Sequence, residues 1–224
     1  TPGLEIEQAF GVIMDIHEPV KSQFAYDDQF GYLTACPTNA GTGMRASAML
    51  HIPGIIMTGQ LPNISNTIAK MGMTVRGIYG EGSDAVGNMV QLSNQITLGL
   101  NERDIVDNLK SVASKLIANE RNARRLILET KASQVEDQVM RSFGVLKYAR
   151  RLSSKETISM LSDIKMGISM GLITGIEHNE LHSLMMDTAP CQLQHTLGKE
   201  LIESERDIIR ADMVKKALSN TKEA

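Results

Sequence analysis

The chain has 224 residues, which is enough to bury the core of one large domain or of two small ones. Its 23 lysines and arginines nearly balance its 26 aspartates and glutamates, and the net charge of −3 gives no electrostatic reason to expect a nucleic-acid partner. The sequence has only two cysteines, no apolar run of the ~20 residues that cross a bilayer and no pattern of a signal peptide. These features predict a cytoplasmic protein without a membrane partner.

The first half of the chain alternates between helical and extended patterns. Apolar residues at helical spacing predict a helix over residues 4–22, and residues 32–53 have the pattern of an extended segment. Four shorter elements follow in the order helix, strand, glycine-rich loop and strand: residues 63–71, 73–78, 80–87 and 89–94. Helices and strands in this order predict an α+β fold.

The second half of the chain is helical in character. Residues 102–130 have the pattern of one long helix, because Ile105 and Leu109 recur on one side while charged residues lie opposite. Four further segments show the same periodicity: residues 133–150, 154–170, 177–189 and 204–218. We therefore expect an α+β domain over residues 1–125 and an all-helical domain over residues 126–224.

Two arginines stand beside loops that contain glycine. Arg45 shares one face of the extended segment with Ser47 and Met49, and Arg76 is followed directly by a glycine-rich run. Guanidinium groups bind phosphate through paired hydrogen bonds, and the amides of such loops can add further donors. Either arginine could instead form a structural ion pair, but the combination favours a phosphate site.

A carboxylate and a thiol complete this pattern. Glu81 stands between two glycines, where packing does not demand a carboxylate, so it could bind a cationic acceptor and take its proton. Cys36 precedes the first arginine, and beside a cationic substrate its thiolate would be stabilised as a charge partner. A surface turn and a buried thiol are the simpler alternatives. Together with the two arginines, these residues predict phosphoryl transfer to a guanidinium group.

Two patterns in the helical half could bind ligands. The stretch Arg206-Asp207-Ile208-Ile209-Arg210-Ala211 places two arginines at i and i+4, which suits either an exposed charged face or a pocket for a phosphorylated side chain. His178 and His182 have a spacing that can bind zinc, but no third ligand is apparent, and we expect no metal site.

Several motifs resemble those of a known family. The stretch Cys36-Pro37-Thr38-Asn39-x-Gly41-Thr42-Gly43-x-Arg45-Ala46 resembles the motif of phosphagen (guanidino) kinases. The bacterial protein-arginine kinase branch of that family has stretches similar to Arg76-Gly77-x-Tyr79-Gly80-Glu81-Gly82, to Ser93-Asn94-Gln95-x-Thr97-Leu98-Gly99 and to the helical half. The resemblance covers essentially the whole chain. It implies the C-terminal portion of a guanidino-kinase catalytic domain, with an antiparallel sheet flanked by helices, followed by an all-helical domain for dimerisation and phosphoarginine binding.

The resemblance also implies roles for individual residues. Glu81 and Cys36 would be catalytic, with Glu81 engaging the substrate guanidinium, and we expect Thr38 and Asn39 to shape the same pocket. The residues that would bind ATP, accompanied by Mg²⁺, are Arg45, Ala46, Ser47, Ala48, Met49, Arg76, Gly77, Ile78, Tyr79, Gly80 and Glu81. Those that would form a phosphoarginine pocket for allosteric control are Arg206, Asp207, Ile208, Ile209, Arg210 and Ala211.

The activity that the resemblance implies is transfer of the γ-phosphoryl group of ATP to exposed arginine side chains of proteins. Such kinases mark proteins for a Clp ATPase/protease, act on a stress-response repressor, work with a zinc-binding activator protein and form homodimers. The family's catalytic domain begins well before Thr1, so we expect a fragment or a truncated gene product. Two alternatives stay open: a phosphoarginine-binding module without catalysis, and a kinase for small guanidino compounds.

Overall fold

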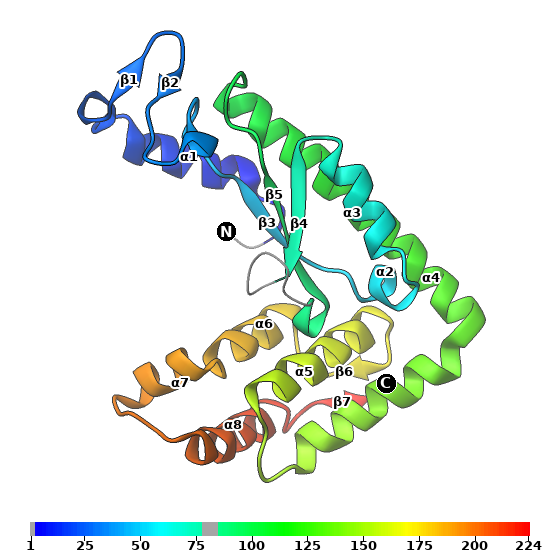
Figure 1. The fold of residues 1–224 in the computed structure, drawn as a ribbon. Coiled ribbons are helices and arrows are strands. Elements are labelled where there is room, and N and C mark those ends of the chain that lie inside the picture. Colours follow the sequence, from blue (N-terminus) through cyan, green and yellow to red (C-terminus); the bar gives the residue numbers. More distant parts are fainter. Residues whose placement is uncertain (1–2, 78–84) are drawn as a thin grey trace. The chain divides into compact units, whose positions relative to one another are not determined.

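The computed structural model describes residues 3–77 and 85–224, which form two compact units (Figure 1). We call residues 1–85 and 89–123 the sheet unit, and residues 86–88 and 124–224 the helical unit. The chain therefore passes from one unit to the other not only after residue 123 but also on both sides of residues 86–88.

The sheet unit combines short strands with helices. In chain order it contains α1 (Ile6–His17), η1 (Lys21–Gln23), β1 (Tyr26–Asp27), β2 (Gly31–Tyr32), η2 (Pro37–Asn39), β3 (Ser47–His51), α2 (Pro53–Met57), α3 (Leu61–Ala69), β4 (Met73–Gly77) and β5 (Met89–Asn94). It also contains the first part of α4, which runs from Glu102 to Tyr148 and has a non-helical residue, Lys131, with φ −141° and ψ 28°.

Strands β3, β4 and β5 form an antiparallel sheet in the order β3–β5–β4 (Figure 1). The central strand aligns Gln91 with Met49 of β3 and with Arg76 of β4. The next residue of β5, Leu92, is aligned with Ala48 of β3 and with Val75 of β4. Because successive side chains of a strand point to opposite faces, the sheet has a Gln91 face and a Leu92 face.

The Leu92 face packs against α3 and α4 and forms the core of the sheet unit. Ile68 of α3 and Leu109, Val112 and Leu116 of α4 are buried in this core. Their spacing of three and four residues along α4 gives the helix an apolar stripe. Each fully buried leucine or isoleucine contributes about 1.5–3 kcal/mol to stability. The Gln91 face is therefore the face on which the sheet can present polar side chains.

A buried carboxylate of α4 fixes the start of α2. The two oxygens of Glu120 accept hydrogen bonds from the backbone N–H groups of Gly54 (3.0 Å) and Ile55 (2.9 Å). N–H groups in the first turn of a helix have no partner inside the helix, and a carboxylate also suits the positive end of the helix dipole. Pro53, which has no N–H, stands first in the helix, where none is needed.

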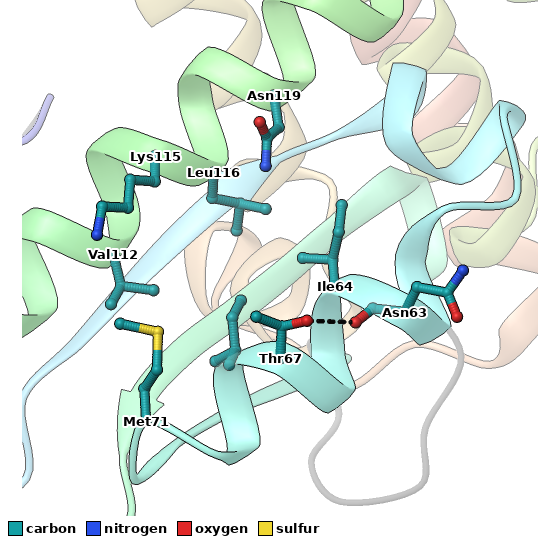
Figure 2. A pocket seen from close by; sticks show the side chains of 9 residues that line it. Asn63, Ile64, Thr67, Met71, Val112, Lys115, Leu116 and Asn119 are labelled. Carbon is teal, nitrogen blue, oxygen red and sulfur yellow. Dashed lines mark hydrogen bonds between the residues drawn. The ribbon is translucent and has the colours of Figure 1, made fainter.

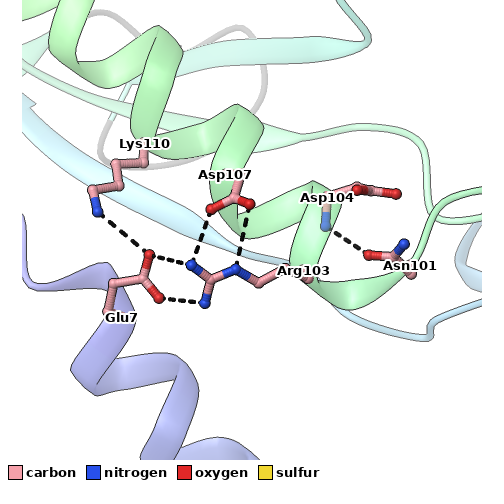
Figure 3. Close-up of polar contacts among 6 residues, drawn as sticks. All are labelled: Glu7, Asn101, Arg103, Asp104, Asp107 and Lys110. Carbon is pink, nitrogen blue, oxygen red and sulfur yellow. Dashed lines mark hydrogen bonds and ion pairs between the residues drawn. The ribbon is translucent and has the colours of Figure 1, made fainter.

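Ion pairs connect α1 with the start of α4 (Figure 3). Glu7 lies 2.6 Å from Arg103 and 3.4 Å from Lys110. Asn101 caps α4 by accepting a hydrogen bond from the N–H of Asp104 (2.8 Å). The hydrogen bond from Arg103 is the main reason why the pKa of Glu7 lies below its ordinary value. The folded state thus favours the carboxylate, and this link weakens as pH falls through the pKa of Glu7.

The helical unit contains the remainder of α4 and shorter elements. These are η3 (Val86–Asn88), α5 (Ser154–Ser169), β6 (Ile173–Thr174), α6 (His178–Asp187), α7 (Pro190–Leu197), α8 (Glu203–Ala217) and β7 (Lys222–Glu223). Strands β6 and β7 pair in antiparallel fashion. Local sequence explains two helix ends: Ser153 accepts a hydrogen bond from the N–H of Glu156 (3.2 Å) before α5, and Gly198 ends α7 in the left-handed conformation.

Helices α4 and α5 pack closely inside the helical unit. Gly167 of α5 is buried, and a Cβ there would lie 2.6 Å from a methyl group of Val139. The buried carboxylate of Asp163 accepts hydrogen bonds from the amide of Gln138 (2.9 Å) and the hydroxyl of Ser142 (2.6 Å). Burial raises the pKa of Asp163, because the charged form loses its water.

The α+β fold class and the antiparallel sheet flanked by helices are confirmed, and the strand predicted over residues 89–94 has those bounds. The prediction of a continuously extended segment over residues 32–53 was wrong, because η2 folds residues 37–39 and α2 begins at Pro53. Helix α7 and the β6–β7 pair were not predicted. In the part of the chain that the structure describes, no helix has both the length and the apolar character needed to cross a bilayer.

Candidate functional site

The two arginines predicted to bind phosphate lie on the same face of the sheet. Arg76 of β4 is on the Gln91 face, together with Met49 of β3. Arg45 lies four residues before Met49. The N–H of Asn94 still bonds to the carbonyl of Ala46 (3.3 Å), so the alternation of side chains between the two faces continues to Arg45, which shares the face of Met49. Arg76 is level with Met49, so the two arginines are offset by four residues along the strands, about 13 Å, and β5 separates their strands by roughly 10 Å. Only an extended anion could therefore contact both side chains.

Arg45 is exposed and loosely held. Its Nε lies 3.4 Å from the amide oxygen of Asn39, and its Nη1 lies 3.4 Å from the backbone oxygen of Asn94. These distances exceed the usual 2.7–3.2 Å of N–H···O hydrogen bonds. The guanidinium can therefore turn towards a ligand without giving up strong bonds.

Asn94 holds the backbone on both sides of the Arg45 segment. Its buried side-chain amide accepts a hydrogen bond from the N–H of Ala46 (2.8 Å) and donates to the carbonyl oxygens of Met44 and Ile96 (3.1 Å each). A buried amide with these bonds satisfied fixes the course of the backbone, because any other course would leave polar groups unpaired. The position of Arg45 is thus set from β5.

Thr97 fixes the loop that precedes Arg45. Its buried hydroxyl lies 3.1 Å from the carbonyl oxygen of Thr38 and 2.8 Å from that of Ala40, and its own carbonyl accepts a hydrogen bond from the N–H of Thr42 (3.2 Å). Between these contacts Gly41 has a φ of 102°, and a Cβ there would lie 2.4 Å from the oxygen of Thr97. Only glycine fits this close approach.

Cys36 stands at the start of that loop with an exposed thiol. Its sulfur lies 3.0 Å from the hydroxyl of Thr38, and the hydroxyl of Thr34 donates to its carbonyl oxygen (2.6 Å). Hydrogen bonds from the hydroxyl and N–H of Thr38, with a smaller contribution from the charge of Arg45, lower the pKa of the Cys36 thiol. These contacts shift the titration of Cys36 towards the thiolate, and its predicted role as a charge partner of a cationic substrate stays a prediction.

The remaining predicted nucleotide-binding residues differ in what they can offer. Ser47 and Met49 are exposed on the arginine face, whereas Ala46 and Ala48 pack against the core and can offer only backbone groups. Gly77 is buried at the end of β4. The predicted roles of the next four residues lie outside the described part of the chain and stay predictions; these residues are Ile78, Tyr79, Gly80 and Glu81.

The donors on this face suit a polyphosphate anion. Arg45 and Arg76 are cationic, and the amide of Gln91 and the hydroxyl of Ser47 lie between them, joined by a hydrogen bond of 3.0 Å. Guanidinium groups match the paired oxygens of phosphate. Mg²⁺ that accompanies a nucleotide normally keeps phosphate oxygens and water as most of its ligands, so a site for Mg-ATP needs few protein ligands for the metal.

The arginines of α8 have a different environment. Arg210 is only 1% exposed, and its guanidinium donates to the carbonyl oxygens of Thr188 (2.9 Å) and Leu152 (2.6 Å) and to the carboxylate of Asp207 (2.7 Å). Asp207 also accepts a hydrogen bond from the N–H of Leu152 through its backbone oxygen (3.0 Å). Arg210 thus joins α8 to the end of α6 and to the segment before α5.

Other members of the predicted phosphoarginine pocket are more accessible. Arg206 is half-buried and donates to one backbone carbonyl oxygen at 2.6 Å, and Ile208 is exposed. The carboxylate of Asp207 lies 4.0 Å from the exposed guanidinium of Arg151. Arg206 and Arg151 are therefore more accessible to a ligand than the buried Arg210. The pocket itself stays a prediction.

A cavity of about 260 Å³ lies between α3 and α4, away from the predicted site residues (Figure 2). Its lining includes the apolar side chains of Ile64, Met71 and Leu116 and the polar side chains of Lys115 and Asn119. None of its lining residues belongs to the Gln91 face. It is an irregularity in the packing of the two helices rather than part of the arginine site.

Asn94 and Thr97 are scaffold residues whose role the sequence did not reveal. Both occur in the stretch Ser93-Asn94-Gln95-Ile96-Thr97-Leu98-Gly99, which was noted only for its resemblance to a family. Their positions near the end of an apolar strand could have indicated that these two polar side chains are buried and hydrogen-bonded. Nothing in the sequence says which distant backbone groups they bind.

Two family models match the chain. The model described as ATP:guanido phosphotransferase, C-terminal catalytic domain, matches residues 1–123, and the one described as Protein-arginine kinase McsB C-terminal domain matches residues 132–224. Because the first covers more than half of the chain, the chain belongs to the ATP:guanido phosphotransferase family.

Curated relatives give a finer comparison. The chain is 48% identical to a protein-arginine kinase of Halothermothrix orenii over 97% of its own length and 63% of the relative, and 47% identical to a protein-arginine kinase of Bacillus subtilis over 97% and 60%. It thus spans about three fifths of the length of these relatives. A solved taurocyamine kinase from Schistosoma mansoni aligns with 49% of this chain and 15% of that one, at 36% identity and a TM-score of 0.43.

Proposed function

We propose that the chain carries the nucleotide-binding and acceptor-binding elements of a protein-arginine kinase, which transfers the γ-phosphoryl group of ATP to arginine side chains of proteins. The observation that carries this proposal is that Arg45 and Arg76 share one face of the sheet, next to the thiolate-favouring Cys36. Membership in the guanido phosphotransferase family supports the reaction class, and the names of the curated relatives support protein arginine as the acceptor.

The sheet face would act on the phosphate side of the reaction. Transfer of a phosphoryl group depends mainly on alignment and on neutralising the charge of the moving group. Arg45 and Arg76 would hold the oxygens of the triphosphate from two strands, and Ser47 and Gln91 would offer further polar contacts between them. Mg-ATP supplies the phosphoryl group and the metal's positive charge. The rigid sheet register sets the spacing between the two guanidinium groups.

The loop that begins at Cys36 would act on the acceptor side. A guanidinium group is a poor nucleophile until it is held by anions and loses a proton. The Cys36 thiolate would place negative charge beside the acceptor, and Thr38 and Asn39 would shape the pocket. Glu81 is the predicted carboxylate that binds the acceptor and draws off its proton.

Further roles follow from the resemblance and belong to the proposal only. The phosphorylated proteins would be substrates of a Clp ATPase/protease, a stress-response repressor would be one target, and a zinc-binding protein would act as activator. The helical unit would mediate homodimerisation and bind phosphoarginine through the Arg206–Ala211 motif. The free thiols of Cys36 and Cys191 suit a reducing, cytoplasmic compartment.

A transfer assay tests the proposal. Purified protein incubated with γ-labelled ATP and an arginine-rich protein should produce acid-labile label, located on arginine by mass spectrometry. We expect Arg45→Ala to lower kcat/KM by about 10²–10³-fold, because one preorganised charge on the transferred group is lost. Arg121→Ala, which removes an exposed arginine of α4, should leave the rate unchanged. Label only on serine or threonine would contradict the proposal.

The two alternatives give different results with the same preparation. A phosphoarginine-binding module would bind free phosphoarginine in calorimetry, lose that binding in Arg206→Ala and transfer no label. A kinase for small guanidino compounds would label free arginine or a similar compound and leave proteins unlabelled. The match of the helical half to the C-terminal domain model of protein-arginine kinases favours a protein acceptor over a small one.

A further inference from the structure

Four aromatic rings gather where α1 meets the hairpin of β1 and β2 in the sheet unit (Figure 1). The ring of Tyr32 lies at the centre. Its centroid is 5.4 Å from that of His17, 6.1 Å from that of Phe24 and 5.1 Å from that of Tyr26, and all three approaches are edge to face. His17 and Phe24 also stack on each other at 5.8 Å. Rings attract one another in both arrangements, so these four residues, which we call the aromatic cluster, form one packed group.

Two rings of the aromatic cluster are open to solvent. Phe24 is 51% exposed and Tyr26 is 59% exposed, and Ile13, which stands one helical turn before His17 on α1, is exposed as well. Single apolar residues are common on protein surfaces, but a contiguous group of them can mark a surface that binds another molecule. Tyrosine is also enriched among the residues that contribute most to binding. The aromatic cluster is therefore a candidate docking surface.

Backbone hydrogen bonds fix the aromatic cluster beside the loop that begins at Cys36. The N–H of Tyr32 donates to the carbonyl oxygen of Gly41 (2.7 Å), and the N–H of Gly41 donates to the carbonyl oxygen of Tyr32 (3.3 Å). Gly31 comes equally close, since a Cβ there would lie 2.4 Å from the oxygen of Gly41. Tyr32 and Cys36 are four positions apart in the sequence, so their Cα atoms lie within about 14 Å of each other. A short polypeptide segment can span that distance.

The surroundings of the aromatic cluster are acidic. Over residues 15–32 the sequence has one lysine, Lys21, and four carboxylates, which belong to Asp15, Glu18, Asp27 and Asp28. Lys21 is paired with Glu18, whereas Asp15 and Asp28 are exposed and have no ion pair in the part of the chain that the structure describes. Negative potential attracts cationic ligands, and a guanidinium group also binds the face of an aromatic ring. The charge and the rings together are complementary to an arginine-bearing polypeptide.

We propose that the aromatic cluster is a docking subsite for the protein acceptor and binds an arginine-bearing segment next to the arginine that is phosphorylated. The inference rests on the proposed function, in which the Cys36 loop lies on the acceptor side. A neighbouring arginine of the acceptor would place its guanidinium on the exposed ring of Tyr26 or Phe24. Binding at a second point raises the effective concentration of the target arginine at the loop. The kinase would then prefer acceptors in which several arginines lie close together in the sequence.

Peptide binding tests the inference without requiring catalysis. One fluorescein-labelled peptide has a target arginine and two further arginines, and a matched peptide has citrulline in place of those two. Citrulline has nearly the shape of arginine but no charge. Both peptides are titrated with the purified protein and followed by fluorescence anisotropy. We expect the arginine peptide to bind about tenfold more tightly, because both the negative potential and the aromatic rings favour its charge.

Variants separate the rings from the charges. Tyr26→Ala should reduce the preference for the arginine peptide about threefold, and Phe24→Ala combined with Tyr26→Ala should abolish it, whereas Tyr26→Phe keeps a ring and should keep the preference. Asp15→Asn combined with Asp28→Asn should weaken binding about threefold at low salt and less at high salt. Tyr148→Ala is the control, because it removes an aromatic side chain that is 77% exposed but lies on α4, outside the aromatic cluster.

The outcomes distinguish the inference from the proposed function. Circular dichroism checks the fold, and if the double ring variant does not fold, Tyr26→Ala and the aspartate variant still provide the comparison. Equal affinity for the two peptides, or a preference that the ring variants leave unchanged, would overturn the inference and leave the proposed function standing. Self-association that is lost in Tyr26→Ala, without peptide binding, would also overturn it and assign the rings to an interface between copies of this chain. Peptide preference with label only on serine or threonine would overturn the proposed function and the acceptor role with it.

Discussion

Two arginines of this chain, Arg45 beside the sheet and Arg210 on α8, show how differently one residue type can be used. Arg45 is exposed and has two contacts of 3.4 Å, whereas Arg210 is 1% exposed and has three hydrogen bonds of 2.6 to 2.9 Å. A loosely bonded, exposed guanidinium keeps its donors for a ligand. A buried guanidinium with its donors engaged holds the fold together, and removing it leaves carbonyl and carboxylate groups unpaired.

The largest expected effect is on stability at Arg210. Arg210→Ala removes the buried partner of the Asp207 carboxylate, leaving only the exposed Arg151 at 4.0 Å, and should lower the free energy of unfolding by about 3–5 kcal/mol. Arg45→Ala, which removes only long and exposed contacts, should lower it by less than about 0.5 kcal/mol. Denaturant unfolding followed by circular dichroism measures both. Equal losses in the two variants would remove the contrast between a structural and a ligand-binding arginine.

The next effect concerns the scaffold beneath Arg45. Asn94→Ala breaks the bonds to Met44, Ala46 and Ile96 and should cost about 1–3 kcal/mol, because buried backbone groups lose their partners. Its matched control is Gln91→Ala on the same strand, where one exposed bond to Ser47 is lost and the stability should hardly change. Thermal unfolding compares them. A stable Asn94→Ala protein would show that Arg45 is positioned by something other than this amide.

A smaller loss is expected at Thr97. Thr97→Val keeps the shape of the side chain but removes the hydroxyl that lies near the carbonyl oxygens of Thr38 and Ala40, so we expect a cost of about 0.5–1.5 kcal/mol. Thr67→Val on α3 removes a hydroxyl bonded only within its own exposed helix and should cost less. The same unfolding assay distinguishes them. An equal cost at both positions would argue against a special role for the Thr97 hydroxyl.

The smallest expected effect is a shift in the reactivity of Cys36. Hydrogen bonds from Thr38 favour the thiolate and lower the pKa of this thiol, so Thr38→Val should raise that pKa. Alkylation by iodoacetamide, which follows the thiolate, should then reach half of its maximal rate at higher pH. The measurement uses a Cys191→Ser background so that only Cys36 reacts. If the pH of half-maximal alkylation were the same in Thr38→Val as in the parent protein, the Thr38 hydroxyl would not stabilise the thiolate.

Much of the fold could be predicted from sequence because its signals are local. β5 has apolar residues bounded by polar and glycine residues, and the long α4 has a regular apolar stripe, so both were identified. The sequence shows two separate helical patterns, over residues 102–130 and 133–150. In the structure the non-helical residue Lys131 lies between them, inside α4. Helix α2 was missed because its start is capped by Glu120, a residue far away in the sequence.

The site could be predicted in part. The common face of Arg45 and Arg76 follows from strand alternation once the register is known, but the register itself depends on pairing with β5. The burial of Arg210 could not be predicted, because two arginines at i and i+4 look the same on an exposed helix and on a packed one. The positive φ of Asn88 was equally invisible, since it depends on the fit of the segment against α5.

The three-residue segment η3 also has a consequence for anyone who wishes to cut the molecule into pieces. A recombinant fragment that starts at residue 124 would lack the backbone that covers Ile158 and the amide that bonds to Ser162. Such a fragment would expose an apolar methyl group on α5 and would lack one hydrogen bond of the Ser162 hydroxyl. Splicing residues 86–88 back would be needed before the fragment could represent the helical unit of the intact chain.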